Sequence, residues 1–428
     1  MAASFTLEAP DWVVQGQPTI YSCQTNSTIT SAFRIVITVD EKDSTGTYQL
    51  LGKYYLTMNV ESRVHFDLND VVQNMVTADY LNNASQDIHT SAFGGTNTGR
   101  PARNASRSFR VGCGEYDGST ETLREDTSTI TVVTGYVPRS EGFNVDHSLV
   151  YGMSNLATKP KSWMVPQSAS TGAIPVTTIE VDPTDTGVVT HMMKPTSSAT
   201  LSPYQIVAIT YDGSTVVYAE SLVNIPNYGY PSVVSDRLIA GNAVVHSAIY
   251  PSQIHAYSGF TGDWTRVDVT LLNSSATQIS GLLRFTKRCI RSANKVTRVA
   301  FLNSVGGYSY YSMDGRTSRR LTRRQKVVDK VVGTYGAQTF DVPVSAPDTE
   351  TFGVELDEVY TLNAQVKLDD MFLLEEMFKS RTHSIQLDSG EAFIPVILDT
   401  TSISIKDEPN SSISQVSVDV KLAQRVRC

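Results

Sequence analysis

Residues 32–58 read AFRIVITVDEKDSTGTYQLLGKYYLTM, and this stretch decides the class of fold. Two runs rich in β-branched and aromatic residues, 32–39 and 47–58, are separated by the turn-forming segment DEKDSTG. Runs of this kind, with polar residues between the apolar ones, are typical of a β-hairpin. The sequence therefore predicts paired antiparallel strands in its first part.

The same pattern returns further along the chain. Residues 204–225, YQIVAITYDGSTVVYAESLVNI, predict a second hairpin with Asp212 and Gly213 at its turn, because Asp-Gly tolerates the positive φ that tight turns need. Charged residues make up 18% of the chain, against a usual value of about 25%. Tyr (20) outnumbers Phe (14), which also favours strands. We expect a mainly β protein of several antiparallel β-sandwich or barrel-like domains with two short helices.

The two helices are predicted from apolar spacing. Asp67 or Asn69 can cap a short helix that places apolar residues of 71–76 on one face, and residues 368–380 repeat apolar side chains at helical spacing. We divide the chain into three domains: 1–150, an N-terminal β-sandwich with a long polar loop at 82–107; 151–290, a Pro- and Thr-rich β domain; and 291–428, a C-terminal β domain that contains the helix 368–380.

The polar loop has few apolar anchors and many turn formers. It reads NNASQDIHTSAFGGTNTGRPARNASR and includes Arg100, Arg103 and Arg107. Loops of this length inside a compact domain are uncommon, and they are often functional or ordered by a partner. Two interpretations stay open: a disordered surface loop, or an arm that docks on a neighbouring subunit.

Charge and cysteine content limit the partners and the compartment. The net charge is −8 and the pI is about 5.4, so no overall positive field attracts the chain to DNA or to an anionic membrane. The four cysteines lie far apart without a C-x-x-C pair, which indicates reduced thiols rather than zinc ligands or a disulfide framework. We see no signal peptide and no apolar run of the ~18 residues that a membrane-spanning helix needs.

Motifs for catalysis, cofactors and metals are not found. The seven histidines are scattered, without H-E-x-x-H, and there is no G-x-S-x-G elbow. The carboxylates of 369–376 are expected to form the solvated face of the predicted helix, and VDPTDTG (181–187) is expected to be an Asp-Pro turn rather than a calcium loop. We therefore predict a protein that is not an enzyme and nominate no catalytic, cofactor-binding or metal-binding residue.

Residues 301–326 combine a Gly-Gly pair, tyrosines and a dense basic cluster. Gly306 and Gly307 lie between two β-like runs and predict a tight turn or bulge. The basic residues allow a surface for single-stranded nucleic acid, an edge strand kept soluble by charge, or a surface that meets the acidic face of another subunit. We prefer the last and nominate as assembly residues, with the three loop arginines, Arg316, Arg319, Arg320, Arg323, Arg324 and Lys326.

Several short motifs occur in a characteristic order along the chain. Their residues are Phe66, Asp67 and Leu68, then Gly114, Glu115 and Tyr116, then Cys289, Arg298, Phe301, Leu302, Asn303, Gly306, Gly307 and Tyr308, and finally Leu374 to Ser380. This order resembles that of virion structural, tail-associated proteins of tailed bacteriophages, especially of Bacteroidetes-infecting and marine phages. The resemblance implies a particle component at the tail or its junction with the head, with no catalytic residues.

These observations lead to one favoured function and several alternatives. We expect a structural subunit that is made in the host cytoplasm and assembles with other phage virion proteins into a homo-oligomeric ring, a tail tip or a tail-connector layer. A receptor- or glycan-binding protein is the alternative, because exposed Trp12, Trp163 and Trp264 could stack on sugars. A nucleic-acid lining that uses Arg316 to Lys326 is kept as a third hypothesis, and an enzyme without nominated residues as a fourth.

Overall fold

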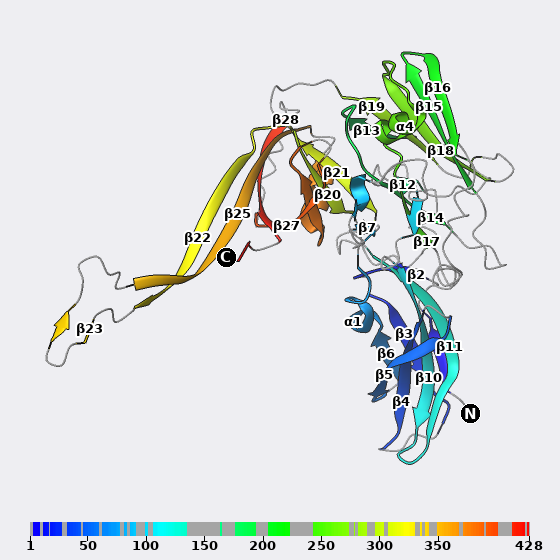
Figure 1. The fold of residues 1–428 in the computed structure, drawn as a ribbon. Helices are drawn as coiled ribbons and strands as arrows, with labels where there is room; N and C mark the ends of the chain where they lie inside the picture. Colours follow the sequence, from blue (N-terminus) through cyan, green and yellow to red (C-terminus); the bar gives the residue numbers. More distant parts are fainter. Residues whose placement is uncertain are drawn as a thin grey trace.

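The computed structural model shows a mainly β protein composed of several sheets and a few short helices (Figure 1). The sheets are sandwich-like rather than closed barrels, and they are antiparallel apart from the pairs β2–β11, β12–β14 and β13–β19. The structure describes residues 3–8, 12–16, 18–27, 32–43, 46–59, 62–77, 81–83, 86–90, 99–101, 106–134, 163–164, 176–193, 204–222, 243–273, 278, 281–288, 296–303, 307–329, 334–335, 339–341, 349–367, 371–388, 391–400, 413–423 and 426–427.

The N-terminal part is a sandwich of two sheets that pack face to face. One sheet has the order β1 (Ser4–Leu7), β3 (Ile20–Gln24), β6 (Arg63–Asp67). The other has the order β2 (Trp12–Val14), β11 (Glu121–Val133), β10 (Ser106–Tyr116), β4 (Arg34–Lys42), β5 (Tyr48–Leu56). The predicted hairpin of 32–58 is confirmed, because β4 and β5 pair antiparallel from Ile35 with Leu56 to Lys42 with Tyr48.

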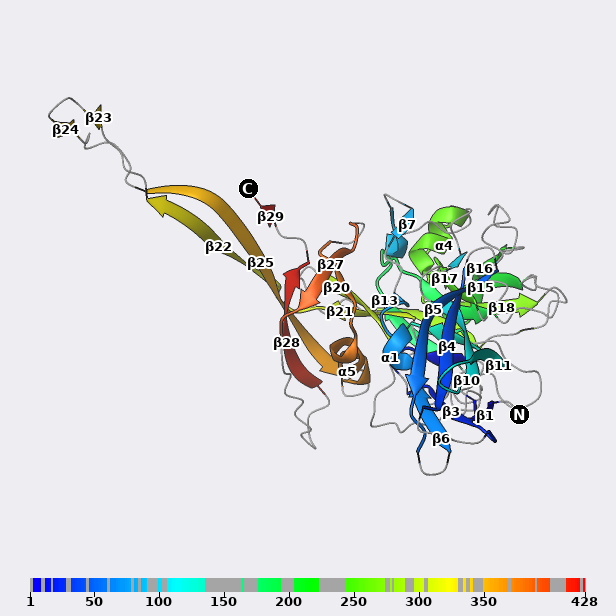
Figure 2. The same ribbon diagram turned by 90° about the horizontal axis from the view of Figure 1, so that it is seen from below.

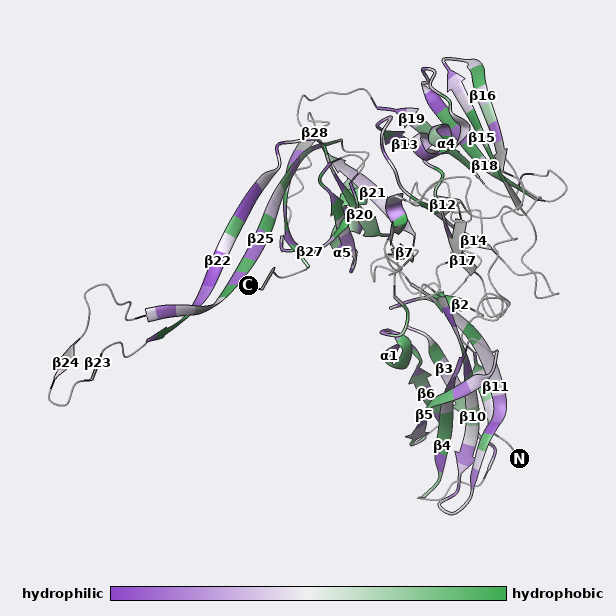
Figure 3. Ribbon diagram, in the orientation of Figure 1, coloured by the Kyte–Doolittle hydropathy of each residue, from purple (hydrophilic) through white to green (hydrophobic). Residues whose placement is uncertain are grey.

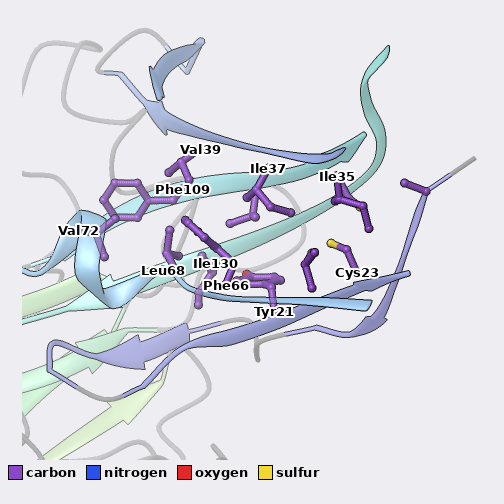
Figure 4. Close-up of a cluster of buried hydrophobic side chains, with 14 of the residues drawn as sticks. Tyr21, Cys23, Ile35, Ile37, Val39, Phe66, Leu68, Val72, Phe109 and Ile130 are labelled. Atoms are coloured by element: carbon purple, nitrogen blue, oxygen red, sulfur yellow. The ribbon is translucent and has the colours of Figure 1, made fainter. Parts of the chain in front are cut away.

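Apolar side chains from both sheets fill the space between them (Figure 4). Tyr21 of β3, Ile35 of β4 and Phe109 of β10 are fully buried there. The helix α1 (Asn69–Val72) closes one end with Leu68 and Val72. Asp67 stabilises this turn, because its Oδ1 accepts hydrogen bonds from the backbone N–H groups of Asn69 and Thr19 at 3.0 and 2.9 Å.

The middle of the chain forms a five-stranded sheet with one helix and a smaller sheet beside it. The larger sheet has the order β13 (Val176–Val181), β19 (Leu282–Lys287), β18 (Arg266–Asn273), β15 (Tyr204–Asp212), β16 (Thr215–Leu222). The hairpin β15–β16 turns at Gly213, whose φ is +58°, as the Asp-Gly dipeptide predicted. The smaller sheet has the order β12 (Trp163–Met164), β14 (Val189–Met193), β17 (Ala243–Ser247), β9 (Gly99–Pro101).

One helix was not predicted. The helix α4 (Pro251–Ser258) buries Ile254 against the five-stranded sheet, where Trp264 is also buried. Proline stands at its first position and Gly259 follows it with φ +70°. Both are ordinary helix boundary signals. The helix is short and its apolar stripe is narrow, so periodicity alone does not reveal it.

The C-terminal part is the largest sheet. It has the order β21 (Tyr308–Met313), β20 (Thr297–Leu302), β26 (His383–Gln386), β27 (Ile394–Leu398), β28 (Ile413–Leu422), β25 (Thr349–Lys367), β22 (Ser318–Asp329), and β29 (Val426–Arg427) also pairs with β25. The helix α5 (Met371–Lys379) covers one face with Met371, Leu374 and Met377. It confirms the helix predicted within 368–380.

The stretch 82–107 differs from both expectations in two described places. The short 3-10 helix η1 (Ile88–Thr90) is buried: Ile88 packs with Val188 and Tyr308, which come from other parts of the chain. The strand β9 pairs antiparallel with β17. These parts are neither a free loop nor an arm on another subunit, because Ile88 and the ring of His89 provide a buried anchor in a polar stretch. Two two-stranded sheets complete the described fold: β7 (Leu81–Asn83) with β8 (Gln86–Asp87), and β23 (Thr334–Tyr335) with β24 (Phe340–Asp341).

Candidate assembly interface

The strands β22 and β25 form a ribbon that extends away from the rest of the molecule (Figures 1 and 2). They pair antiparallel from Ser318 with Thr361 to Asp329 with Thr349, and the register shifts between Lys326 and Val327. All twelve residues of β22 are exposed. The sheet order places β22 at the edge, so the basic cluster lies on a projecting edge strand. A two-stranded ribbon alone is only marginally stable in water.

The two faces of the ribbon follow from the alternation of side chains along a strand. Arg319, Leu321 and Arg323 of β22 share one face with Glu358 and Leu356 of β25, given the pairs Arg319–Tyr360, Leu321–Glu358 and Arg323–Leu356. We call this the Leu321 face. Arg320, Thr322 and Arg324 lie on the opposite face with Asp357 and Glu355, which we call the Arg320 face.

The Leu321 face continues the buried side of the large sheet. Tyr360, Leu362, Ala364 and Val366 of β25 point into the cluster that α5 covers. Every second residue of a strand lies on the same face, so Glu358, Leu356 and Val354 follow Tyr360 along this face towards the ribbon. These three side chains are only partly buried. Opposite them Leu321 is 55% exposed. An apolar stripe therefore extends beyond the helix that covers it in the sheet.

Part of the basic cluster is paired within the ribbon. Arg319 donates to Glu358, and this contact raises the pKa of Arg319 and lowers the pKa of Glu358. Burial and the Glu358 carboxylate raise the pKa of Tyr360 to about 12. On the Arg320 face, Asp357 accepts Arg324 Nε at 3.2 Å and Lys421 Nζ at 3.1 Å.

The other basic residues of the cluster are available. Arg320 and Arg323 are exposed, and within the described residues no ion pair joins either one to a carboxylate. Arg316 and Lys326 are exposed as well. The hydropathy colours show β22 as hydrophilic over much of its length, interrupted by apolar positions (Figure 3). The strand thus combines free positive charge with a narrow apolar stripe.

The remaining nominated residues lie in other elements or outside the described residues. Arg107 is half-buried in β10 of the N-terminal sandwich, and its guanidinium pairs with Glu41 at 2.6 Å. This contact lies within the sandwich, in a strand other than the basic strand β22. Arg100 lies in β9, while Arg103 and Gly306 lie outside the described residues. Gly307 forms part of a turn: its N–H donates to Asn303 Oδ1 at 2.8 Å, and its carbonyl accepts from Asn303 N at 2.7 Å.

A buried polar cluster, which we call the junction, connects distant parts of the chain and was not predicted. Arg298 of β20 pairs with Asp185, with 3.1 Å between Nε and Oδ1, and donates to the carbonyl of Thr186. The predicted Asp-Pro turn is confirmed, because Asp185 N donates to the carbonyl of Asp182 at 3.0 Å. The Arg298 guanidinium also lies near three aromatic rings, 5.0 Å from the centroid of Tyr310.

Tyr310 and His89 extend the junction. The Tyr310 hydroxyl accepts from the Val188 N–H at 2.8 Å and lies 2.7 Å from His89 Nδ1. The ring of His89 also packs edge-on against Tyr308. Complete burial lowers the pKa of His89 to about 3, so its ring stays neutral at ordinary pH. These contacts join η1, the segment before β14 and the hairpin β20–β21.

The structure offers no arrangement for metal chemistry among the residues it describes. No group of three or more His, Cys, Asp or Glu side chains there is placed to hold a metal ion. None of the described helices has the length and apolar character needed to cross a bilayer. Trp264 is buried at 5% exposure, so its proposed stacking on a sugar is wrong, and the side chains of Trp12 and Trp163 lie outside the described residues.

Comparison with known proteins adds no relative. No protein-family model matches the chain, and no curated protein matches it significantly.

Proposed function

We propose that this chain is a structural subunit of a tailed-phage virion that assembles with further copies and other virion proteins into a ring or a tail-tip or tail-connector layer. The projecting ribbon carries this proposal. A strand of twelve exposed residues that is paired on one side only leaves its free edge and its arginines available to carboxylates of another chain. In an assembly, another chain can cover the exposed residues of the ribbon. The order of short motifs resembles that of tail-associated phage proteins, and this resemblance is why we propose a phage virion as the assembly.

The junction supports a structural role rather than a chemical one. Its ion pair, hydrogen bonds and aromatic contacts connect η1, the turn before β14, the hairpin β20–β21 and the strand β26. Subunits that carry mechanical load need their parts fixed relative to one another. Polar groups buried with their partners fix such a geometry better than apolar contacts alone.

Two measurements test the proposal. Peptides of this chain should be found in purified particles by mass spectrometry, and a cryo-electron microscopy map of the same particles should show it as a repeated layer. Absence from particles that are otherwise complete overturns the proposal. A second arm uses the purified chain, for which mass photometry should detect species larger than a monomer.

A further inference from the structure

We propose that Cys23 and Cys113 form a redox site, at which a small-molecule disulfide oxidises the two thiols to a disulfide between the two sheets of the N-terminal sandwich. Cys23 lies in β3 and Cys113 in β10, so the two thiols come from opposite sheets. Both side chains are 0% exposed and belong to the same apolar cluster. Figure 4 shows Cys23 in the packed space between the sheets. This site is independent of the proposed virion role.

The first step is that the two thiols are neighbours. Both cysteines are free thiols in the structure. The pKa of the Cys23 thiol is raised above its ordinary value, first by its hydrogen-bonding contact with the Cys113 side chain and then by burial. The two sulfur atoms therefore face each other across the interior of the sandwich.

The second step is that the two sheets approach closely around this pair. The strand partner of Cys23 is Phe5 of β1, and the strand partner of Cys113 is Asp126 of β11. The backbone N–H of Phe5 donates to Asp126 Oδ2 at 2.9 Å, so one sheet reaches the other through a short side chain beside the thiols. Cα atoms of β1 come within 8 Å of Cα atoms in β10 and β11. Disulfides need Cα atoms about 4.4–6.8 Å apart, so a small local movement is sufficient.

A second contact between the sheets lies along the same two strands. Thr25 is two residues from Cys23, and Glu115 is two residues from Cys113. The Thr25 hydroxyl donates to one carboxylate oxygen of Glu115, and the Ser27 hydroxyl donates to the other at 2.8 Å. The cysteines are thus held in place by polar contacts on two sides, which keeps their thiols facing each other.

The reaction is thiol–disulfide exchange with a small-molecule disulfide such as oxidised glutathione. The thiolate of one cysteine attacks a sulfur of the reagent, which breaks the S–S bond of the reagent and releases one half as a thiol. The thiolate of the other cysteine then attacks the mixed disulfide, so the bond between Cys23 and Cys113 forms and the second half leaves. The cysteines lose two electrons to the reagent, and their two protons end on the two released thiols.

Burial decides when this exchange takes place. Only a thiolate attacks a disulfide, and in the closed sandwich the buried Cys23 stays a protonated thiol. The exchange therefore occurs while the sandwich is open, during folding or unfolding. Once closed, the sandwich keeps the redox state in which it folded, with thiols after folding in a reducing compartment and a disulfide after folding with an oxidant.

The first test identifies the link. The full chain is refolded from urea either with reduced and oxidised glutathione or with a reducing agent alone, and free thiols are then blocked with iodoacetamide. Trypsin digestion without reduction should yield a linked pair of the peptides 1–34 and 111–124, which contain Cys23 and Cys113. This pair should predominate over links to Cys289 or Cys428. No link, or links spread evenly over the cysteines, overturns the proposal.

The second test measures the effect of the link. A disulfide that closes a long loop restricts the unfolded chain, so the oxidised chain should unfold about 5–10 °C higher than the reduced chain in differential scanning calorimetry. Cys113→Ala should abolish this difference and Cys289→Ala should retain it. Each variant is compared with its own reduced form, so a loss of stability from the substitution itself cancels. A difference that persists in Cys113→Ala overturns the assignment of the site.

The third test concerns access. The folded, reduced chain is incubated with the same glutathione mixture without urea, and it should stay unlinked for the time in which the refolding chain becomes oxidised. Equally fast linking of the folded chain overturns the conclusion that burial sets the moment of oxidation. These measurements follow the thiols alone, so their failure leaves the proposed virion role to the particle measurements that test it.

Discussion

Arg298 and Asp185 form an ion pair in which each side chain is only 4% exposed, with 3.1 Å between Nε and Oδ1. Each would be a costly isolated charge at this depth, and the opposite charge of its partner compensates it. The pair links the strand β20 of the large sheet to the turn before β14 in the small one.

Breaking this pair should destabilise the protein severely. Asp185→Asn or Arg298→Met leaves one buried charge without its partner, and we expect a loss of about 3–5 kcal/mol in the free energy of unfolding. Urea unfolding followed by intrinsic fluorescence measures it. Lys287→Ala, which breaks the solvent-exposed pair with Asp263, serves as the control and should have little effect. Equal losses at the two sites would contradict the structural role of the junction.

The buried histidines should make the protein sensitive to acid. Burial lowers the pKa of His89 to about 3 and that of His255 to about 4, so the unfolded chain, with His pKa near 6.5, binds protons that the folded chain does not. The stability contributed by the neutral rings is therefore complete above about pH 6.5 and decreases as pH falls towards these values. For His89 alone the slope approaches about 1.4 kcal/mol per pH unit.

Unfolding free energies measured between pH 4 and 7 test this dependence. His89→Gln should give a shallower slope than the wild type in this range, together with a lower stability at pH 7 where the Tyr310 contact is lost. An unchanged slope in the variant would show that His89 is not the group responsible.

A glycine in the N-terminal sandwich should tolerate no side chain. Gly114 lies at the irregularity where β10 and β11 shift register, and a Cβ there would come within 2.2 Å of the Thr122 carbonyl oxygen. Gly114→Ala therefore forces the two backbones apart, and we expect a loss of about 3 kcal/mol. Gly213→Ala is the matched control, because its φ of +58° is strained for alanine but the space around it is open. It should lose about 1 kcal/mol in the same unfolding experiment.

Arg320 and Arg323, which form no ion pair with the described residues, should differ in their effect on assembly. Arg323→Glu reverses a charge on the Leu321 face, whereas Arg320→Glu reverses one on the opposite face. We expect Arg323→Glu to weaken assembly by about tenfold and Arg320→Glu to weaken it less, with both effects smaller at high salt because exposed charges are screened. Sedimentation velocity at low and high NaCl concentrations distinguishes the two. The reverse order would place the contact on the Arg320 face.

Much of the fold was predictable because its signals are local. The hairpins of 32–58 and 204–225 were predicted from alternating residues and turn formers, and the helix within 368–380 from its apolar spacing. The basic segment 316–326 could be recognised as an edge strand or contact surface. The projection of this strand away from the sheet could not be predicted. It depends on where the neighbouring strands β28 and β29 stop pairing with β25.

The junction was not predictable from one sequence. Arg298, Asp185, Tyr310 and His89 come from four separate segments, and none of them stands in a local motif that indicates burial. The turn at 182–185 was predicted, but nothing in its residues points to the arginine that Asp185 meets. The ion pair of Arg107 with Glu41 of the neighbouring strand β4 was likewise not predictable, because the two residues are far apart in the sequence.

The contact between His89 and Tyr310 also has a consequence for synthesis, since it joins residues 221 positions apart. At about 5–20 residues per second, a ribosome delivers Tyr310 roughly 10–45 s after His89. The N-terminal sandwich can form during this interval. Ile88 and His89 become buried only after Tyr308 and Tyr310, which pack against them, have been synthesised. A nascent chain stalled before β21 should therefore expose this segment to protease, and release of the stall should protect it.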